Sequence, residues 1–254
     1  DRRKIDYWHL LDREISLRVM SQNNPMKKYP SIPDLRSGAQ ARMPRFAFDY
    51  LDGGAGDEGG LANNRAAFHQ VQFVPDYLEQ RSDPETATEI FGRSYAMPFG
   101  VAPVGLSGLI WPRAAEYLAA TAKEANIPFC LSAMATSSIE KIGAIAGEHA
   151  WFQLYPLADH GHEKELLDRA KAAGFSALLV TVDTPTTRRG LREIKNGMTV
   201  PPKLSLNNLS RIALNPSWAL ATLAAGPPRF ESLLPYFPAG ANYASVSEMI
   251  SGLL

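Results

Sequence analysis

The chain has 254 residues, of which 45% are hydrophobic, and this is enough apolar material for one sizeable core. Lysine plus arginine (26) balance aspartate plus glutamate (26), so we expect no general attraction to nucleic acid or to anionic lipid. Cys130 is the single cysteine, which excludes an intrachain disulfide and favours a reducing compartment.

Neither a membrane span nor a secretory leader is expected from the sequence. No apolar stretch reaches the roughly 20 residues that cross a bilayer, and the chain opens on the charged run DRRKIDYWHLL. We therefore expect a cytoplasmic protein. The first plausible start in a folded context is Met26, so residues 1–25 are either an extra amphipathic helix or upstream sequence. We treat residues 1–30 as an N-terminal extension of a domain that covers residues 31–254.

The first expected elements are helices. Ser31 is a reasonable N-cap and Pro33 suits a first helical turn, so we predict one helix over residues 32–51. Gly53 and Gly54 end it. A short helix is predicted over residues 61–68, and turn signals in residues 70–96 favour short strands and loops.

A regular alternation of strands and helices follows. Apolar runs predict strands over residues 98–102, 128–132, 151–155 and 177–182, and helical patterns predict helices over residues 113–125, 138–146 and 163–173. This order is typical of parallel βα units, in either an open doubly wound sheet or a closed eight-stranded barrel. The turn after the first strand does not match the dinucleotide fingerprint, and each strand ends in polar or proline-containing sequence, so the α/β (β/α)8 TIM barrel is favoured.

The remaining residues contain no fifth βα unit. Residues 184–242 are rich in proline and asparagine and include a helix-like stretch over residues 218–223, so they indicate a long excursion from the fourth strand. A final helix is predicted over residues 246–254. With about four βα units, the chain corresponds to half of a barrel.

Several motifs occur in one order along these elements: PRFAFDYLDGGAGD with NRAAF (residues 44–57 and 64–68), PFGVAP (98–103), LSAMATSS (131–138), WFQLY (151–155) and TVDTP (181–185). Together they resemble the FMN-dependent 2-hydroxy-acid dehydrogenases and oxidases, a family that includes glycolate oxidases, lactate dehydrogenases and mandelate dehydrogenases. The resemblance covers about residues 30–250 and implies the N-terminal half of that family's TIM barrel.

The resemblance also implies a site that holds FMN. Ser132, Gln153 and Thr181 would bond to the polar edge of the isoalloxazine ring, because that edge carries both donors and acceptors. Backbone at Ala102, Pro103 and Val104 would line the side of the ring at N5. The alternative is that the polar side chains only fill the top layer of the barrel.

Four further residues are candidate catalytic groups by the same resemblance: Tyr50, Tyr155, Asp183 and, after a one-residue shift of the alignment, Arg189. Tyr50 would donate a hydrogen bond to the substrate carboxylate, and Tyr155 would bind its hydroxyl. Asp183 would orient a catalytic histidine. The alternatives are a helix tyrosine that bonds to a backbone carbonyl, an aromatic at the barrel rim and a loop carboxylate.

The sequence departs from the family pattern at two kinds of position. The family's basic histidine and its neighbouring arginine have no counterpart, because His9, His69, His149, His160 and His162 lie at no recognisable strand end. The arginine that the family carries after Asp183 falls at Gly190 in a gapless alignment, and a shift of one residue would recover Arg189. We interpret His160 and His162 as solvated residues and expect no metal site.

The implied reaction is oxidation of an (S)-2-hydroxy acid of the lactate, glycolate or mandelate class to the 2-oxo acid, with hydride transfer to flavin N5. The chain alone is expected to be inactive, and the family implies a homotetramer when complete. Two alternatives are a non-catalytic half-barrel that folds only with a partner and a different FMN-dependent barrel enzyme. The stretch near Pro216 is either a helix in peripheral contact with the inner membrane or a loop that covers the barrel, and we favour the loop.

Overall fold

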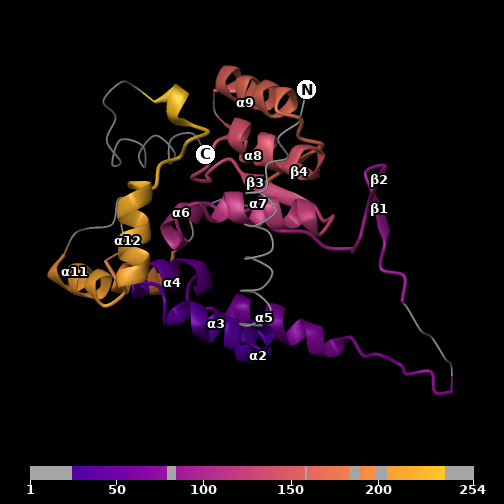
Figure 1. The fold of residues 1–254 in the computed structure, drawn as a ribbon, viewed down its shortest axis with the longest axis horizontal. Helices are drawn as coiled ribbons and strands as arrows, with labels where there is room; N and C mark the ends of the chain where they lie inside the picture. Colours follow the sequence, from indigo (N-terminus) through magenta and orange to yellow (C-terminus); the bar gives the residue numbers. More distant parts are fainter. Residues whose placement is uncertain (1–24, 79–83, 158, 184–188, 198–204, 238–254) are drawn as a thin grey trace, which may run out of the picture. The chain divides into compact units, whose positions relative to one another are not determined.

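The computed structural model describes residues 25–78, 84–157, 159–183, 189–197 and 205–237, and the chain divides into two compact units, residues 1–43 and 44–254. The first unit contains α2 (Pro25–Lys28) and α3 (Ile32–Gln40). The α-helices of the second unit are α4 (Arg45–Asp52), α5 (Gly59–Ala67), α6 (Ser107–Ile110), α7 (Ala114–Glu124), α8 (Ile139–Ala146), α9 (His160–Ala172), α10 (Leu191–Lys195), α11 (Leu206–Ala213) and α12 (Pro216–Ala225). Its strands and 3-10 turns are β1 (Thr88–Ile90), β2 (Arg93–Tyr95), β3 (Phe129–Ser132), β4 (Ala150–Leu154), β5 (Ala177–Val180), η1 (Phe68–Gln70), η2 (Gly147–His149) and η3 (Leu234–Tyr236) (Figure 1).

The single helix predicted over residues 32–51 is wrong, because the structure has two helices there. The capping box at Ser31 is present: Asp34 N–H donates to its hydroxyl (3.3 Å), and Ser31 N–H donates to the Asp34 carboxylate (3.1 Å). Pro44 separates α3 from α4, because proline has no N–H to continue a helix and disfavours helical backbone in the residue before it.

The second unit contains a parallel sheet in the order β3-β4-β5, and α8 and α9 connect its strands. Ser132 lies opposite Gln153, and Leu154 lies opposite Val180. The predicted alternation of parallel strands and helices is confirmed for these elements. Since the carboxyl ends of parallel strands lie at one edge, residues that follow the three strands come together.

The strand predicted over residues 98–102 is reduced to a single parallel bridge between Val101 and Phe129. Val101 N–H donates to Pro128 O (2.8 Å), and Cys130 N–H donates to Val101 O (3.0 Å). The chain approaches Pro128 so closely at Gly100 that a Cβ there would lie 2.5 Å from the proline ring. A longer ladder is also limited by Pro98, which has no N–H to donate.

The core lies between the sheet and the helices that pack against it. Helices α7 and α8 both contact β3, and α8 also contacts β4. Strand β3 is buried throughout, whereas β5 alternates between half-buried and exposed residues. Phe152, Leu131, Ile139 and Ile142 are almost wholly buried, and each contributes about 1.5–3 kcal/mol of transfer free energy.

A short antiparallel hairpin packs at the amino end of β4. Tyr95, on β2, is buried, and its phenol oxygen accepts a hydrogen bond from the indole N–H of Trp151 (3.2 Å). The two rings meet edge to face, with centroids 6.1 Å apart. The hairpin therefore covers the amino end of β4, while the polar residues lie at the opposite, carboxyl end.

Residues outside the βα units only partly follow the expectations. The helix-like stretch over residues 218–223 lies within α12, whereas α10 and α11 were not predicted as helices. Before β1, the extended residues 71–78 expose Val71, Phe73, Val74, Tyr77 and Leu78. The helices expected over residues 1–25 and 246–254 lie almost entirely outside the described residues.

The environment of Cys130 yields a first prediction. The thiol is buried in β3, and burial raises its pKa to about 12, well above the usual value of a cysteine. The thiolate is the reactive form, so alkylation by iodoacetamide at pH 8 should be slowed by roughly a thousandfold in the folded chain. Labelling followed by mass spectrometry with and without guanidinium chloride checks this, and equal rates in both conditions would contradict it.

Candidate functional site

Three polar side chains form a hydrogen-bonded row at the carboxyl ends of adjacent strands. The Ser132 hydroxyl donates to Gln153 Oε1 (2.8 Å), and Gln153 Nε2 donates to Thr181 Oγ1 (2.8 Å). Met134 N–H donates to the Ser132 oxygen (3.2 Å). Ser132 and Gln153 are buried and Thr181 is half-buried. The structure thus brings together the three residues that the sequence nominated for a ring edge, with the glutamine amide held on both sides.

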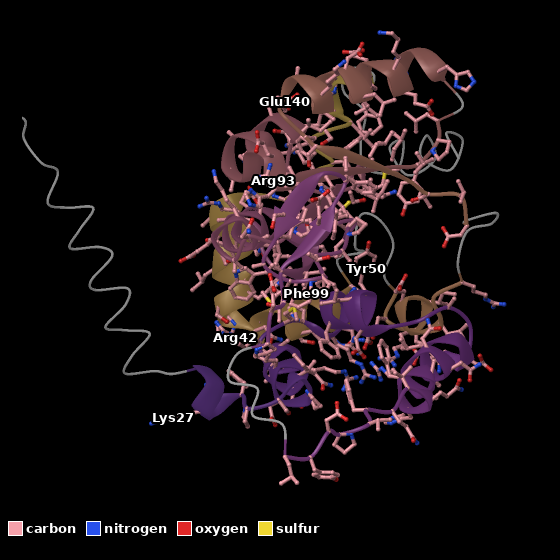
Figure 2. The ribbon with its side chains drawn as sticks, turned by 90° about the vertical axis from the view of Figure 1, so that its right-hand side faces the viewer. Lys27, Arg42, Tyr50, Arg93, Phe99 and Glu140 are labelled. Carbon is pink, nitrogen blue, oxygen red and sulfur yellow. The ribbon has the colours of Figure 1, made fainter. Side chains whose placement is uncertain are left out.

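Tyr50, on α4 (Figure 2), contacts the loop that follows Val101. Its phenol donates to the carbonyl of Gly105 (3.1 Å), and Leu106 N–H donates to the carbonyl of Met134 (2.9 Å). Gly108 N–H donates to Thr136 Oγ1 (2.7 Å). Helix α4 is therefore joined to two successive strand-end loops, and Tyr50 makes the backbone contact that was the alternative to a substrate contact.

The other nominated residues follow β4, β5 and the Val101 bridge along the chain. Tyr155, directly after β4, is half-buried, and Asp183, after β5, is exposed. The side chain of Arg189 is exposed, while its carbonyl accepts a hydrogen bond from Gly56 N–H (2.9 Å). The nominated flavin-lining backbone, Ala102, Pro103 and Val104, follows the Val101 bridge and is exposed or half-buried.

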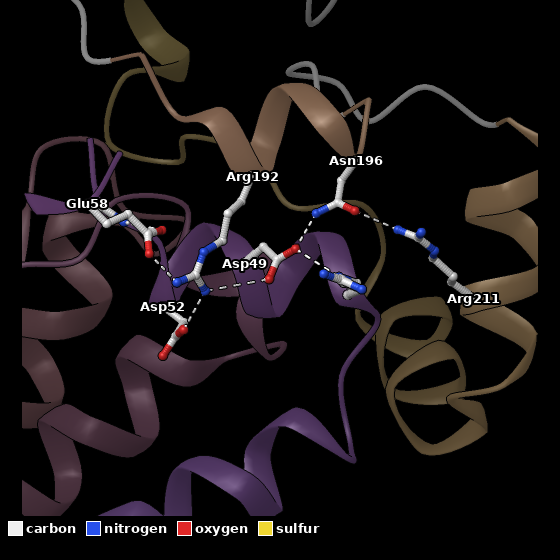
Figure 3. Close-up of polar contacts among 8 residues, drawn as sticks. Asp49, Asp52, Glu58, Arg192, Asn196 and Arg211 are labelled. Atoms are coloured by element: carbon white, nitrogen blue, oxygen red, sulfur yellow. Dashed lines mark hydrogen bonds and ion pairs between the residues drawn. The ribbon is translucent and has the colours of Figure 1, made fainter. Parts of the chain in front are cut away.

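A cluster of charged side chains joins α4 to the residues after β5 (Figure 3). Arg192 Nη1 donates to Asp52 Oδ2 (2.7 Å), and Arg192 Nη2 donates to Glu58. Arg192 also forms a longer ion pair with Asp49 (3.9 Å). The hydrogen bond from Arg192 is the main reason that the pKa of Glu58 lies below the usual value of a glutamate.

Asp49 is the buried centre of the cluster. Its side chain is 6% exposed, and it accepts hydrogen bonds from Asn196 Nδ2 and from Arg45 Nε (3.3 Å). Asn196 in turn accepts from Arg211 Nη1 (2.7 Å). The cluster balances three carboxylates against three guanidinium groups: Asp49, Asp52 and Glu58 against Arg45, Arg192 and Arg211.

Sequence reasoning missed this cluster. The available signal was the pair of acids three residues apart on one helix, Asp49 and Asp52, of which only Asp49 has a base, Arg45, one turn away on that helix. Their partner, Arg192, lies 140 residues further along the chain than Asp52. Nothing in the local pattern around Arg192 specified that pairing.

The described histidines lie away from the strand ends. His149 is in the turn before β4, with Asn126 as partner (3.0 Å), and His160 and His162 lie at the start of α9. Among the residues that the structure describes, no group of three or more His, Cys, Asp or Glu side chains could hold a metal ion. His9 is outside the described residues.

Comparison with known proteins decides the family. The model of the FMN-dependent dehydrogenases matches residues 39–251. The chain belongs to this family. An L-lactate dehydrogenase from Xanthomonas euvesicatoria is 40% identical over 186 residues, which are 73% of this chain and 48% of that protein. An L-lactate dehydrogenase from Pseudomonas syringae is 38% identical over 201 residues, which are 78% of this chain and 52% of that protein.

Solved structures support the same family. A monotopic membrane protein, (S)-mandelate dehydrogenase, aligns with a TM-score of 0.80 and 30% identity, over 87% of this chain and 58% of that one. The chain spans about half the length of the curated relatives it matches. None of the described helices is both long and apolar enough to cross a membrane.

The cofactor of the family is FMN, and the strand-end row is chemically compatible with it. An isoalloxazine edge presents alternating acceptors and donors, and the row offers one primary amide with a hydroxyl 2.8 Å away on each side. The amide and the hydroxyls can each exchange one internal bond for a bond to a ligand. The described residues therefore fit the ring edge.

The charged cluster yields a second prediction. Because the folded-state pKa of Glu58 is lowered, its stabilising effect is present above the unfolded pKa of about 4.3 and is lost as the pH falls through the folded value. Glu58→Gln should therefore lower the midpoint of thermal unfolding at pH 7, and the difference from wild type should vanish near pH 3. Glu165→Gln, at an exposed position on α9, is the matched control. Parallel curves for Glu58→Gln and wild type from pH 7 to pH 3 would contradict the assignment.

Proposed function

We propose that this chain provides the flavin-edge half of a site that oxidises an (S)-2-hydroxy acid of the lactate, glycolate or mandelate class to the 2-oxo acid. The observation that carries the proposal is the row Ser132–Gln153–Thr181 on three adjacent strand ends. Family membership and the names of the lactate and mandelate dehydrogenases that it matches support the substrate class.

Bound FMN supplies the acceptor for the hydride that leaves the substrate Cα, and the residues of this chain orient the two reactants. Gln153 holds the ring edge between two hydroxyls. Tyr50 exchanges its bond to Gly105 O for a bond to the substrate carboxylate, and Tyr155 binds the substrate hydroxyl. Arg189, whose side chain is exposed next to the Gly56 loop, adds the positive charge that an anionic acid requires.

The reaction also needs a base that accepts the proton of the substrate hydroxyl, and no described histidine lies at this edge of the sheet. Asp183 follows β5 and is the carboxylate that would orient a histidine, but the described histidines lie elsewhere. We therefore propose that the chain on its own binds FMN weakly and does not turn over. The complete site would be a (β/α)8 barrel to which β3, β4, β5 and the Val101 bridge belong, in a homotetramer.

An alternative is a non-catalytic half-barrel that folds against a second polypeptide. The observation that favours it is the uncovered side of β5, where Leu178 and Val180 are about half exposed. Such a chain would take up no flavin. The spectroscopic experiment below therefore distinguishes the two functions.

A third prediction tests the ring-edge assignment. Gln153→Leu removes the only side chain that bonds to both neighbours, so the dissociation constant for FMN, measured by flavin fluorescence quenching, should rise by about tenfold or more. Gln70→Leu, at an exposed position in η1, is the control and should leave it unchanged. An equal FMN affinity for the Gln153 variant and wild type would contradict the assignment.

The reaction itself is tested by an absorbance spectrum of the FMN-loaded chain under nitrogen, followed by L-lactate, glycolate or (S)-mandelate. We expect a bound oxidised flavin that none of the acids bleaches. Bleaching would show that the described half already contains a working base and would overturn the inactivity proposal. A chain that takes up no FMN would overturn the flavin proposal itself.

We also propose peripheral contact with a membrane through α11 and α12, in place of the covering loop that the sequence favoured, because residues 216–225 form a helix. Helix α12 carries no charged residue, and Trp218 alone is buried, with its indole N–H donating to the carbonyls of Leu109 and Ile110. Large apolar side chains point to solvent on the two helices and at the end of α11: Leu206, Leu209, Leu214, Leu220 and Leu223. An apolar surface on short helices is typical of proteins that lie on a bilayer, and a solved relative is a monotopic membrane protein.

A fourth prediction tests this surface. The double variant Leu220→Ser/Leu223→Ser should lower the partition coefficient onto phosphatidylcholine–phosphatidylglycerol vesicles, measured by co-flotation, by about a hundredfold or more, because each buried leucine contributes roughly 1.5–3 kcal/mol. Leu118→Ser, at a partly exposed position on α7, is the control and should float like wild type. A wild-type chain that does not float with vesicles would refute the membrane contact.

A further inference from the structure

We propose that Arg192 is a positioning residue that holds residues 189–196 to α4 and thereby sets the position of Arg189 relative to Tyr50. The inference rests on the proposed function, because it assigns Arg189 to the substrate carboxylate. It adds a residue that none of the motif matches singled out.

The lock consists of a backbone joint and a side-chain clamp. Gly56 N–H donates to Arg189 O (2.9 Å), and Gly56 and Gly190 form a parallel bridge. The guanidinium of Arg192 then reaches back across the joint to Asp52 and Glu58. The backbone bond at Arg189 and the side-chain bonds of Arg192 lie three residues apart. Residues 189–192 are therefore attached to residues 52–58 at two separate points, which limits their movement.

The stem of Arg192 adds a packing contact at the end of α4. Its Cδ lies 3.6 Å from the position that a Cβ on Gly53 would occupy, and Gly53 is the residue at which α4 ends. A larger residue at Gly53 is also excluded by the Asp49 carbonyl, 2.6 Å from the same position. The arginine thus lies against the helix end that carries the two acids.

Burial makes this clamp strong. The side chains of Asp49 and Asp52 are only 6% and 8% exposed, and Arg192 is 34% exposed. Ionised groups at such sites require a partner of opposite charge, because water no longer solvates them fully. Arg45 also contacts Asp49, but its side chain is 70% exposed, so it is screened by solvent and makes a suitable control.

The consequence for the site follows from the different partners of neighbouring residues in α4. On one side Tyr50 donates to Gly105 O, and on the other Asp49 and Asp52 accept from the residues after β5. The hydrogen bond from Gly56 N–H holds the carbonyl of Arg189, so the backbone position from which the Arg189 side chain extends is defined. Removal of the Arg192 guanidinium would leave residues 189–196 held by the Gly56–Arg189 and Asn196–Asp49 bonds, which loosens Arg189 without changing the strand-end row that meets the flavin.

A fifth prediction separates positioning from general stability. In Arg192→Met, amide hydrogen exchange should accelerate at residues 53–58 and 189–196, with no change in β3 or β4. Arg192→Lys should restore part of the protection, and Arg45→Met should behave like wild type. This measurement needs no flavin. Unchanged exchange in Arg192→Met, or equal acceleration in Arg45→Met, would overturn the lock.

Ligand affinities test the link to Arg189. With FMN bound, oxalate serves as an anionic mimic of the substrate, and its dissociation constant should rise about tenfold in Arg192→Met while that of FMN stays within twofold. In an Arg189→Met background the same change at Arg192 should have no further effect on oxalate. A parallel loss of FMN and oxalate affinity, additive effects of the two substitutions, or wild type that holds FMN but no oxalate would each overturn the proposal.

A wild-type chain that takes up no FMN refutes the proposed function, and the assignment of Arg189 to a substrate falls with it. The exchange experiment then decides whether Arg192 locks the two segments. The two failures are therefore distinguishable.

Discussion

Parallel pairing of β3, β4 and β5 is the constraint on which the site depends. It places Ser132 opposite Gln153 and puts Thr181 one residue beyond the Leu154–Val180 pair, so three residues far apart in sequence meet within hydrogen-bond distance. A shift of register by one residue would turn the glutamine to the other face of the sheet and break both bonds. Burial of Phe152 and Leu131 beneath the row keeps that register fixed.

Sequence patterns predicted the parts of the fold that depend on local periodicity. The strands now described as β3, β4 and β5 and the helices between them were expected within a few residues, because their apolar runs and polar helix faces are regular. The predicted helix through Pro44 is wrong because the helical pattern of apolar residues continues across Pro44, whereas proline has no N–H with which to continue a helix. The strand at Val101 was predicted too long, since a close approach such as that of Gly100 to Pro128 is a tertiary property.

For the site, the nominated polar residues could be found because they follow strands and occur in motifs. What could not be found was the way α4 is held. Asp49 and Asp52 have partners after β5, and long-range ion pairs leave no periodic trace in a sequence. The gapless alignment that put Gly190 at the arginine position likewise gave no information on Arg192, whose guanidinium is occupied by carboxylates, or on Arg189, whose carbonyl is bonded to Gly56.

The exposed apolar residues within 71–78 have a consequence for aggregation of the chain. Val71, Phe73 and Val74 together form a segment with high strand propensity, the kind that pairs edge to edge with identical segments of other molecules. Pro75 interrupts it directly after Val74, because proline cannot donate to a ladder. The segment can thus remain apolar and exposed, while the ring of Pro75 limits its growth into a fibril.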